Sequence, residues 1–345
     1  MSENNEVTAG NEDGRGTGRE GRDRTPIRWG VLGTGGIAAV FTEDLLTLPG
    51  HTVAAVGSRA AGTAEAFAGR YGIARSHGSY ADLAADAEVD VVYVATPHPM
   101  HYEPARQCLE AGRAVLVEKP FTTSAADAES LARIARDKGV FAMEGMWTRF
   151  SPLVRRLHDL VADGAIGEVT AVYADFSIAP AFDPHSRLWD AGLGGGALLD
   201  LGCYVLSFTW PLLGPPDTVQ ATAAPAPTGV DANTGILLGY RGGGIALLHC
   251  GLMGDSPHAA TVVGTKGRVE IAAPFYRPTA MTLVRTGAEP ETMTAGLAGH
   301  GYTYQAEEVA RCLRAGLTES PLLPLEESVA VMRVIDTVRE RLQQR

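Results

Sequence analysis

The stretch that decides the fold is Ile27-Arg28-Trp29-Gly30-Val31-Leu32-Gly33-Thr34-Gly35-Gly36-Ile37-Ala38, in which an apolar strand runs into glycines and then into a helical pattern. The spacing is G-x-G-x-x-A. The first glycine allows a tight turn, the second lets a pyrophosphate approach the backbone, and the small third residue lets helix pack on strand. Because strand, turn and helix follow in this order, the stretch predicts a dinucleotide site rather than a plain glycine-rich turn. The predicted cofactor contacts in it are Gly33, Thr34, Gly35, Gly36 and Ile37.

The end of the next predicted strand indicates which dinucleotide is bound. A site for NAD would place Asp or Glu about 20 residues past the glycines, to hold the ribose 2′-hydroxyl. No acidic residue lies between His51 and Gly62, where Ser58 and Arg59 stand instead. This pair attracts a 2′-phosphate, which a carboxylate would repel. The sequence therefore predicts NADP, with NAD less favoured; the alternative is that Arg59 is an ordinary surface arginine.

Length and composition limit the remaining possibilities. A chain of 345 residues predicts two domains, and a net charge of −11 argues against a nucleic-acid partner. The four cysteines are far apart with no C-x-x-C pair, which indicates buried thiols in a reducing cytoplasm and no structural metal site. Residues 1–26 have almost no large apolar side chain and are expected to be a disordered tail. No membrane span or secretory signal is expected.

Two further strand ends carry polar residues. An apolar strand at 89–95 is followed by Thr96-Pro97-His98-Pro99-Met100-His101, at the sheet edge where ligands bind in open α/β folds. Thr96, His98 and His101 are therefore predicted to contact cofactor or substrate, although the histidines could simply shape the loop. A metal site is disfavoured because Pro99 prevents regular helix and no third ligand is evident.

The next strand, at 115–118, ends in Glu118-Lys119-Pro120, and the proline keeps the lysine extended. This predicts Glu118 and Lys119 as cofactor contacts, although a lysine here could also be a solvated strand end. At the following junction between domains, Trp147 and Arg149 are predicted to bind substrate, with packing of the domain interface as the alternative.

The second domain is predicted to span residues 147–345, after a dinucleotide-binding domain at 27–146. Its glycine turn at 194–196 precedes a helix on which Asp200 and Tyr204 share a face. Period-two patterns from 218 to 285 predict an antiparallel meander, with the last helices packing back toward the first domain. The predicted fold class is α/β: a doubly wound parallel sheet plus an α+β domain with an open, mainly antiparallel sheet. That sheet is the expected surface of a homodimer or homotetramer.

These motifs resemble those of the Gfo/Idh/MocA (glucose–fructose oxidoreductase, inositol dehydrogenase, MocA) superfamily over about residues 27–343. The shared marks are the G-x-G-x-x-A turn, Glu118-Lys119-Pro120 and Asp200-x-Gly202-x-Tyr204. Many relatives have histidine where this chain has Tyr204, and tyrosine there resembles the dimeric dihydrodiol dehydrogenase branch, which includes NADP-dependent D-xylose dehydrogenases. Longer stretches similar to that branch are 96–101, 143–150, 194–204, 264–267 and 302–313.

The resemblance implies that Lys119 and Tyr204 act at the reacting carbinol while Asp200 binds and orients. An isolated tyrosine has a pKa of about 10 and is a poor base at neutral pH. A nearby ammonium is expected to favour the phenolate and lower that pKa. The alternative is that Tyr204 is a core tyrosine with a satisfied hydroxyl.

The predicted activity is hydride transfer between NADP(H) and a carbinol of a sugar or vicinal diol, with pocket specificity in Trp147, Arg149, Phe176 and the loops at 182–189 and 275–278. A keto-sugar reductase of the same family is one alternative. A cofactor-bound sensor without turnover is another, because a fold alone does not establish a reaction.

Overall fold

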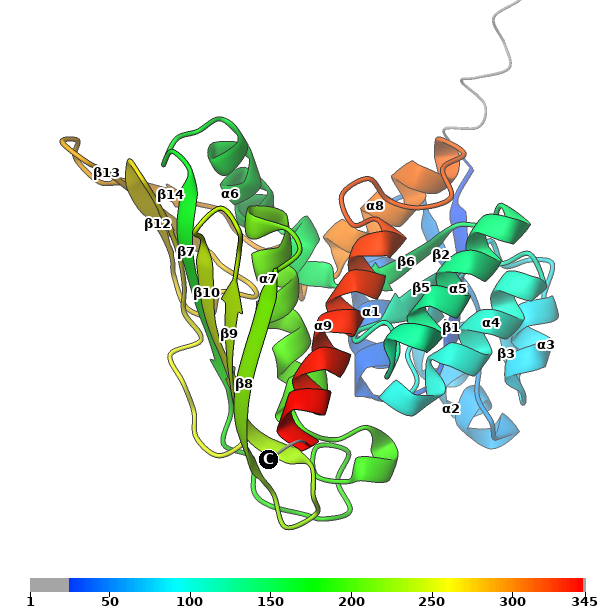
Figure 1. Cartoon of the computed structure of the whole chain (residues 1–345). Coiled ribbons are helices and arrows are strands. Elements are labelled where there is room, and N and C mark those ends of the chain that lie inside the picture. Colours follow the sequence, from blue (N-terminus) through cyan, green and yellow to red (C-terminus); the bar gives the residue numbers. More distant parts are fainter. Residues whose placement is uncertain (1–24, 344–345) are drawn as a thin grey trace, which may run out of the picture.

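The first part of the molecule is a doubly wound α/β unit (Figure 1). The structure is a computed structural model that describes residues 25–343, so the predicted tail lies almost wholly outside the described residues. Six parallel strands stand in the order β3-β2-β1-β4-β5-β6, which reverses between β1 and β4. Ligands bind at such a reversal, at the carboxyl ends of the strands. The strands are β1 (Ile27–Leu32), β2 (His51–Gly57), β3 (Arg75–His77), β4 (Val91–Val94), β5 (Ala114–Glu118) and β6 (Ala142–Gly145).

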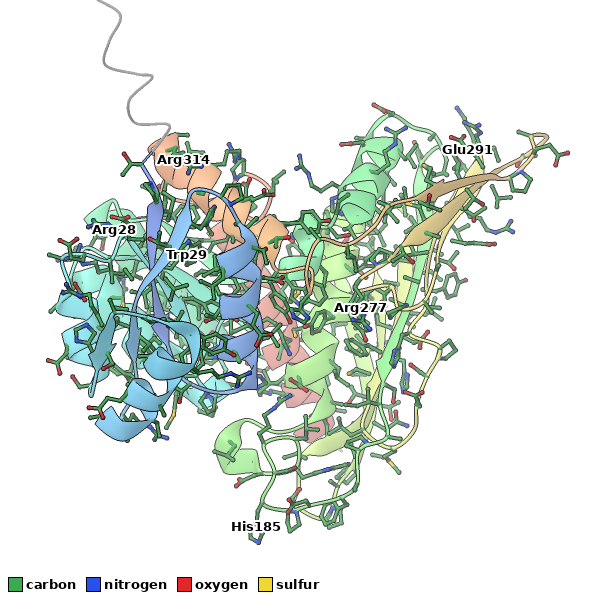
Figure 2. The ribbon with its side chains drawn as sticks, turned by 180° about the vertical axis from the view of Figure 1, so that it is seen from behind. Arg28, Trp29, His185, Arg277, Glu291 and Arg314 are labelled. Carbon is green, nitrogen blue, oxygen red and sulfur yellow. The ribbon has the colours of Figure 1, made fainter. Side chains whose placement is uncertain are left out.

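Helices cover both faces of this sheet, which explains why β4 and β5 are buried throughout. They are α1 (Gly36–Thr47), α2 (Ala61–Tyr71), α3 (Tyr80–Ala85), α4 (Tyr102–Glu110) and α5 (Ala125–Lys138). Side chains fill the space between the layers, and the fully buried Trp29 of β1 lies among them (Figure 2). The three-residue edge strand β3 was missed from the sequence because it is too short to carry a pattern.

The second part is an eight-stranded sheet in the order β14-β13-β12-β11-β7-β10-β9-β8. The strand β7 lies near its middle, pairing antiparallel with β11 and parallel with β10. The expected simple meander is therefore wrong in this detail, because β7 comes before the other strands in sequence and is inserted between them. The strands are β7 (Val169–Ser177), β8 (Thr218–Pro225), β9 (Asp231–Gly239), β10 (Ile245–Gly251), β11 (Ala260–Gly264), β12 (Gly267–Ile271), β13 (Ala280–Arg285) and β14 (Glu291–Thr294).

Helices lie on one face of the second sheet, between it and the first part, while the opposite face points outward (Figure 1). The helices on the inner face are α6 (Pro152–Ala162), the π-helical turn η4 (Leu198–Gly202) and α7 (Cys203–Leu213). The run from Ala191 to Leu213 is long and apolar enough to cross a membrane, contrary to the sequence expectation, but 78% of its most apolar window is buried in the protein. The buried core helices of water-soluble proteins commonly have the same length and apolar composition, so the run is weak support for a membrane span.

The last two helices, α8 (Thr303–Arg314) and α9 (Leu325–Gln343), return to the first part. Helix α9 lies between the two sheets, packed on α5 and β6 on one side and on α7 and β8 on the other (Figure 1). Three short 3-10 segments complete the described chain: η1 (His98–Met100), η2 (Trp147–Phe150) and η3 (Ala191–Leu193).

Candidate active site

A cleft of about 680 Å³ runs along the carboxyl ends of the first sheet and reaches the second part of the molecule. Its wall includes all the predicted cofactor residues, from the glycine turn through Ser58 and Arg59 to Thr96, His98, His101, Glu118 and Lys119. Asp200 and Tyr204 line it from the other side. The sequence motifs, far apart in the chain, therefore meet along one cavity.

The glycine turn has the shape that a dinucleotide requires. Gly33 has a φ of +114°, and a Cβ there would lie 2.7 Å from the backbone oxygen of Ala95, so only glycine fits. A Cβ on Gly35 or Gly36 would meet nothing within 4 Å, so the protein's own packing does not explain these glycines. Helix α1 begins here with no side-chain cap and no acidic residue in its first turn. These observations fit a pyrophosphate on the helix N-terminus.

The far end of the cleft is formed by Ser58, Arg59 and Tyr80. Arg59 is exposed there, and its charge acts on the Tyr80 hydroxyl. The carboxylates among the lining residues, Glu118 and Asp200, both lie at the opposite end. The end of the cleft formed by Ser58, Arg59 and Tyr80 therefore suits a phosphate group and the nucleobase of a dinucleotide.

At the other end, Lys119 lies between Asp200 and Tyr204. Its Nζ atom is 3.0 Å from Oδ1 of Asp200, 2.9 Å from the backbone oxygen of Asp200 and 4.9 Å from the centroid of the Tyr204 ring. The lysine follows β5 of the first part, while the other two residues belong to the second. The group thus forms only when the two parts are packed together.

The helix that carries Asp200 is locally wider than the α-helix expected from the sequence. Residues 198–202 form a π-turn, in which the Cys203 amide donates to the carbonyl of Leu198, five residues earlier. The α-helix resumes at Cys203 and carries Tyr204. Turns of this kind are frequent at functional sites.

Known proteins share this combination of parts. A model of an oxidoreductase family with an NAD-binding Rossmann fold matches residues 27–146, and a model of the GFO/IDH/MocA C-terminal domain matches residues 154–270. The chain belongs to the Gfo/Idh/MocA family. The predicted family, fold class and oxidoreductase character are thereby confirmed.

Several members of the Gfo/Idh/MocA family are similar over most of the chain. A trans-1,2-dihydrobenzene-1,2-diol dehydrogenase of Mus musculus is 36% identical, over 92% of this chain and 97% of the relative. An NADP-dependent D-xylose 1-dehydrogenase of Hypocrea jecorina is 37% identical, over 92% of each chain. Among solved structures, a 3-ketoreductase from Actinomadura kijaniata with NADP and TDP-benzene is 29% identical, with a TM-score of 0.81 over 92% of this chain and 98% of that one.

The electrostatics of this Gfo/Idh/MocA site keep both candidate acid–base groups protonated. Burial lowers the pKa of Lys119, but the Asp200 carboxylate outweighs it and the net shift is upward. Burial raises the pKa of Asp200, yet Lys119 and Arg187 hold that pKa well below its usual range. Burial also raises the pKa of Tyr204 well above its ordinary value, with Cys203 and Glu118 acting in the same direction.

The expectation that Lys119 lowers the pKa of Tyr204 is therefore wrong for this arrangement. The ammonium lies over the face of the ring and is paired with Asp200, so burial of the phenol dominates. Tyr204 is a neutral hydrogen-bond donor at neutral pH. Its hydroxyl oxygen accepts a bond of 3.1 Å from Nε1 of Trp147.

The two predicted substrate residues near the junction lie outside the cleft wall. Trp147 is buried, stacks on Tyr302 and donates to Tyr204, so it orients the tyrosine. Arg149 is also buried, and it binds Glu327 and the backbone oxygens of Ser207 and Leu322. The prediction of substrate contact is corrected for Arg149, because both terminal nitrogens of its guanidinium are engaged in joining η2 to α7 and α9, although its Nε has no hydrogen-bond partner among the described residues.

The side chains of His98 and His101 are more deeply buried than their position in a loop indicated. Both ring nitrogens of His101 face backbone oxygens, Pro120 at 2.8 Å and Thr96 at 2.9 Å, and burial lowers its pKa to about 4. His98 lies 3.6 Å from Asp200, and burial and Lys119 lower its pKa to about 3. Both are neutral rings. Within residues 25–343, no group of three His, Cys, Asp or Glu side chains is placed to hold a metal.

Six lining residues were not singled out as site residues from the sequence: Tyr80, Ala95, Pro97, Arg187, Leu193 and Tyr302. Arg187 donates to Oδ1 of Asp200 at 2.9 Å, and its loop had been expected to shape the pocket. Its neighbour His185 marks the outer end of that loop (Figure 2). Tyr302 is held by Asp44 of α1, whose carboxylate accepts from the Tyr302 amide at 2.8 Å. No local pattern in the sequence marks these contacts.

Proposed function

We propose that the protein is an NADP(H)-dependent oxidoreductase that transfers a hydride to or from a carbinol carbon of a sugar or a vicinal diol. The observation that carries the proposal is the position of Lys119. Its ammonium lies between Asp200 and the Tyr204 ring, at the end of the cleft that holds the glycine turn. A nicotinamide cofactor, when bound, supplies or accepts the hydride. The protein then handles the proton of the substrate oxygen.

The proton is assigned to Tyr204 and Lys119. Because Trp147 donates to the Tyr204 oxygen, the phenol proton is free to point toward a substrate oxygen in the cleft. Lys119 supplies a second proton donor and a positive charge that stabilises an alkoxide. Asp200 fixes the lysine through two contacts and binds Arg187 with the same carboxylate. In the oxidative direction, Tyr204 or Lys119 must first release its own proton before it can accept the proton of the substrate hydroxyl.

The preference for NADP over NAD rests on Arg59 and Ser58. Both line the end of the cleft remote from Lys119, where the lining includes no carboxylate. The D-xylose dehydrogenase and the 3-ketoreductase named above use or bind NADP. Arg59 is therefore assigned to the 2′-phosphate.

Reduction of a keto-sugar is a second candidate for the reaction in the cell. Both Tyr204 and Lys119 have raised pKa values, so both are proton donors at neutral pH. A carbonyl needs such a donor as it accepts a hydride. The similar 3-ketoreductase gives this candidate support from a relative.

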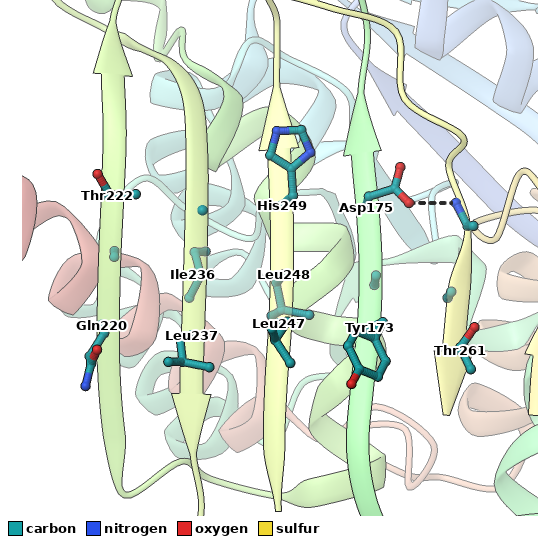
Figure 3. Close-up of a pocket in the computed structure, with 15 residues that line it drawn as sticks. Tyr173, Asp175, Gln220, Thr222, Ile236, Leu237, Leu247, Leu248, His249 and Thr261 are labelled. Atoms are coloured by element: carbon teal, nitrogen blue, oxygen red, sulfur yellow. Dashed lines mark hydrogen bonds between the residues drawn. The ribbon is translucent and has the colours of Figure 1, made fainter. Parts of the chain in front are cut away.

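The outer face of the second sheet is proposed as the contact surface of a homodimer or homotetramer. Figure 3 shows a shallow hollow across β8, β9, β10, β7 and β11, lined by Tyr173, Leu237 and Leu247. These side chains are 39–46% exposed, which is unusual for large apolar residues on adjacent strands. A second copy, related by a two-fold axis, would place the same apolar stripe opposite itself.

The proposed location is the cytoplasm. The cysteines at 108, 203, 250 and 312 are free and buried, as expected in a reducing compartment.

The direct test follows nicotinamide absorbance in both directions, with NADP(H) and NAD(H), across aldoses, polyols, a trans-dihydrodiol and keto-sugars. Turnover of one substrate class with preference for NADP(H) is expected. Tight binding of NADPH, seen by fluorescence, without turnover of any of these classes would contradict the proposal and favour a sensor.

A further inference from the structure

A buried carboxyl group lies behind the turn that carries Lys119. Glu144 is in β6, a four-residue strand buried throughout, where an apolar side chain would be ordinary. Its Oε1 accepts from the backbone amide of Phe121 at 3.0 Å. Its Oε2 accepts from the hydroxyl of Ser328, on α9, at 2.7 Å. One carboxyl thus joins a strand, the Lys119 turn and the last helix.

The turn is held at both polar groups of one peptide unit, the one that joins Pro120 to Phe121. Phe121 comes two residues after Lys119, and its amide is bound by Glu144 from one side. The carbonyl of Pro120, in the same peptide unit, lies 2.8 Å from Nδ1 of the His101 ring. Neither contact touches the lysine side chain. Both fix the backbone from which that side chain reaches Asp200.

We propose that Glu144 is a positioning residue, whose hydrogen bond to the Phe121 amide sets the place of the Lys119 ammonium relative to Asp200 and Tyr204. This inference rests on the proposed function only for its kinetic consequence. The structural claim, that the Glu144 carboxyl holds the Phe121 amide in place, does not depend on any substrate. A shift of about 1 Å in a catalytic group can cost on the order of a hundredfold in rate.

The ionisation of Glu144 offers a direct readout of this contact. Burial raises its pKa to about 7, although the bonds from Ser328 and Phe121 oppose the shift. The charged groups that act on it are Glu327 of α9 and Glu118 of β5, and Cys203 of α7 lies within its field. Ionisation of Glu144 near neutral pH should therefore change the chemical shift of the Phe121 amide that it binds.

The kinetic test compares Glu144→Gln with Glu144→Met. Glutamine keeps an acceptor for the Phe121 amide and a group that can bond to Ser328, while methionine has similar length and no comparable acceptor. We expect kcat to fall about 10- to 100-fold in Glu144→Met and to stay within about threefold of wild type in Glu144→Gln. NADPH affinity, measured by fluorescence, should change by less than about threefold in both, because the glycine turn and Arg59 are untouched.

The matched control is Glu308→Gln. Glu308 is another buried carboxylate, bonded to Arg311 and Ser320 on α8 and the following loop, outside the cleft wall. Its substitution should lower the melting temperature without a selective fall in kcat. A merely structural role of Glu144 would make Glu144→Met behave like this control.

The second test needs no turnover. Labelling with ¹⁵N-phenylalanine gives nine amide signals, and Phe121→Leu identifies the one of interest. In the wild type, the Phe121 signal should titrate with a midpoint near pH 7, following the pKa of about 7 of Glu144. In Glu144→Gln the same signal should not titrate in that range.

Three results would overturn the inference: a wild-type kcat in Glu144→Met, equal losses in Glu144→Gln and Glu144→Met, or a Phe121 amide that does not respond to Glu144→Gln. If Glu144→Met does not fold, the Gln variant and the amide titration still decide. If the protein turns over none of the proposed substrates, the proposed function fails while the amide titration still tests the contact.

Discussion

Lys119 and Asp200 form a 3.0 Å ion pair that joins the dinucleotide-binding unit to the second sheet domain. The lysine is held by the turn after β5, and the aspartate by a π-turn that precedes α7. The proposed catalytic group is therefore formed by the packing of the two parts of the molecule. Substitution of Lys119 or Asp200 should therefore change the rate of the reaction at the substrate oxygen more than it changes the affinity for the cofactor.

The substitution Asp200→Asn should shift the pH–rate profile. Asp200 raises the pKa of Lys119, so its neutralisation removes the charge that keeps the ammonium protonated. The limb of the kcat profile that depends on Lys119 should move to lower pH. The control is Asp217→Asn, which removes a surface partner of Arg241. A profile that is unchanged in Asp200→Asn would exclude this coupling.

The substitution Arg59→Ala should weaken NADP(H) selectively. A charge-assisted contact to phosphate is worth about 1.5–3 kcal/mol, which corresponds to about 10- to 100-fold in Kd. NAD(H) has no 2′-phosphate, so its affinity should hardly change. Titration calorimetry measures both, and Arg70→Ala on α2 controls for loss of a surface arginine. Equal weakening of both dinucleotides would show that Arg59 does not recognise the phosphate.

The substitution Glu144→Gln should flatten part of the dependence of stability on pH. The pKa of Glu144 is about 7 in the folded protein, against an ordinary value of 4.5. A raised pKa contributes stability below the unfolded value, and this is lost as pH rises from about 4.5 to about 7. At 1.36 kcal/mol per pKa unit, the loss is about 3 kcal/mol. Urea unfolding at pH 5 and pH 8 should show this loss in the wild type and not in the variant. The same pH dependence in both proteins would contradict it.

A charge placed on the outer sheet face should separate the subunits. Leu247 is 41% exposed at the centre of the hollow in Figure 3, so Leu247→Glu would bury a carboxylate in the proposed interface. Light scattering should report a monomer for this variant and an oligomer for the wild type. The control is Leu46→Glu, at an exposed leucine of α1. A wild-type monomer at micromolar concentration, or an oligomer that survives Leu247→Glu, would move the interface elsewhere.

The sequence predicts the architecture of the site better than its electrostatics. Gly33, Lys119 and Tyr204 belong to patterns with a local physical reason: a positive φ, a strand end and a helix face. The same reasoning misplaced Arg149. Its buried partner Glu327 lies 178 residues further along the sequence, and no local pattern predicts that contact. The raised pKa of Tyr204 was also missed, since it depends on how deeply the packed domains bury the phenol.

The strand order shows the same limit. Period-two patterns predict most strands of the second domain, because one face is buried and the other is not. They do not predict that β7 lies between β10 and β11, which depends on pairing between residues far apart in sequence. The residues Arg187 and Tyr302 reach the cleft through loops whose course no periodicity describes.

The most direct test of the central claim is a single-turnover measurement of nicotinamide oxidation or reduction in Tyr204→Phe, with the best substrate from the panel. The rate of the wild type should exceed that of the variant by about 10²- to 10⁴-fold, the usual contribution of a positioned acid–base group. NADPH affinity should be unchanged, and Tyr240→Phe, outside the cleft, should behave as wild type. A Tyr204→Phe variant with the wild-type rate of hydride transfer would show that the phenol does not handle the proton and would contradict the account.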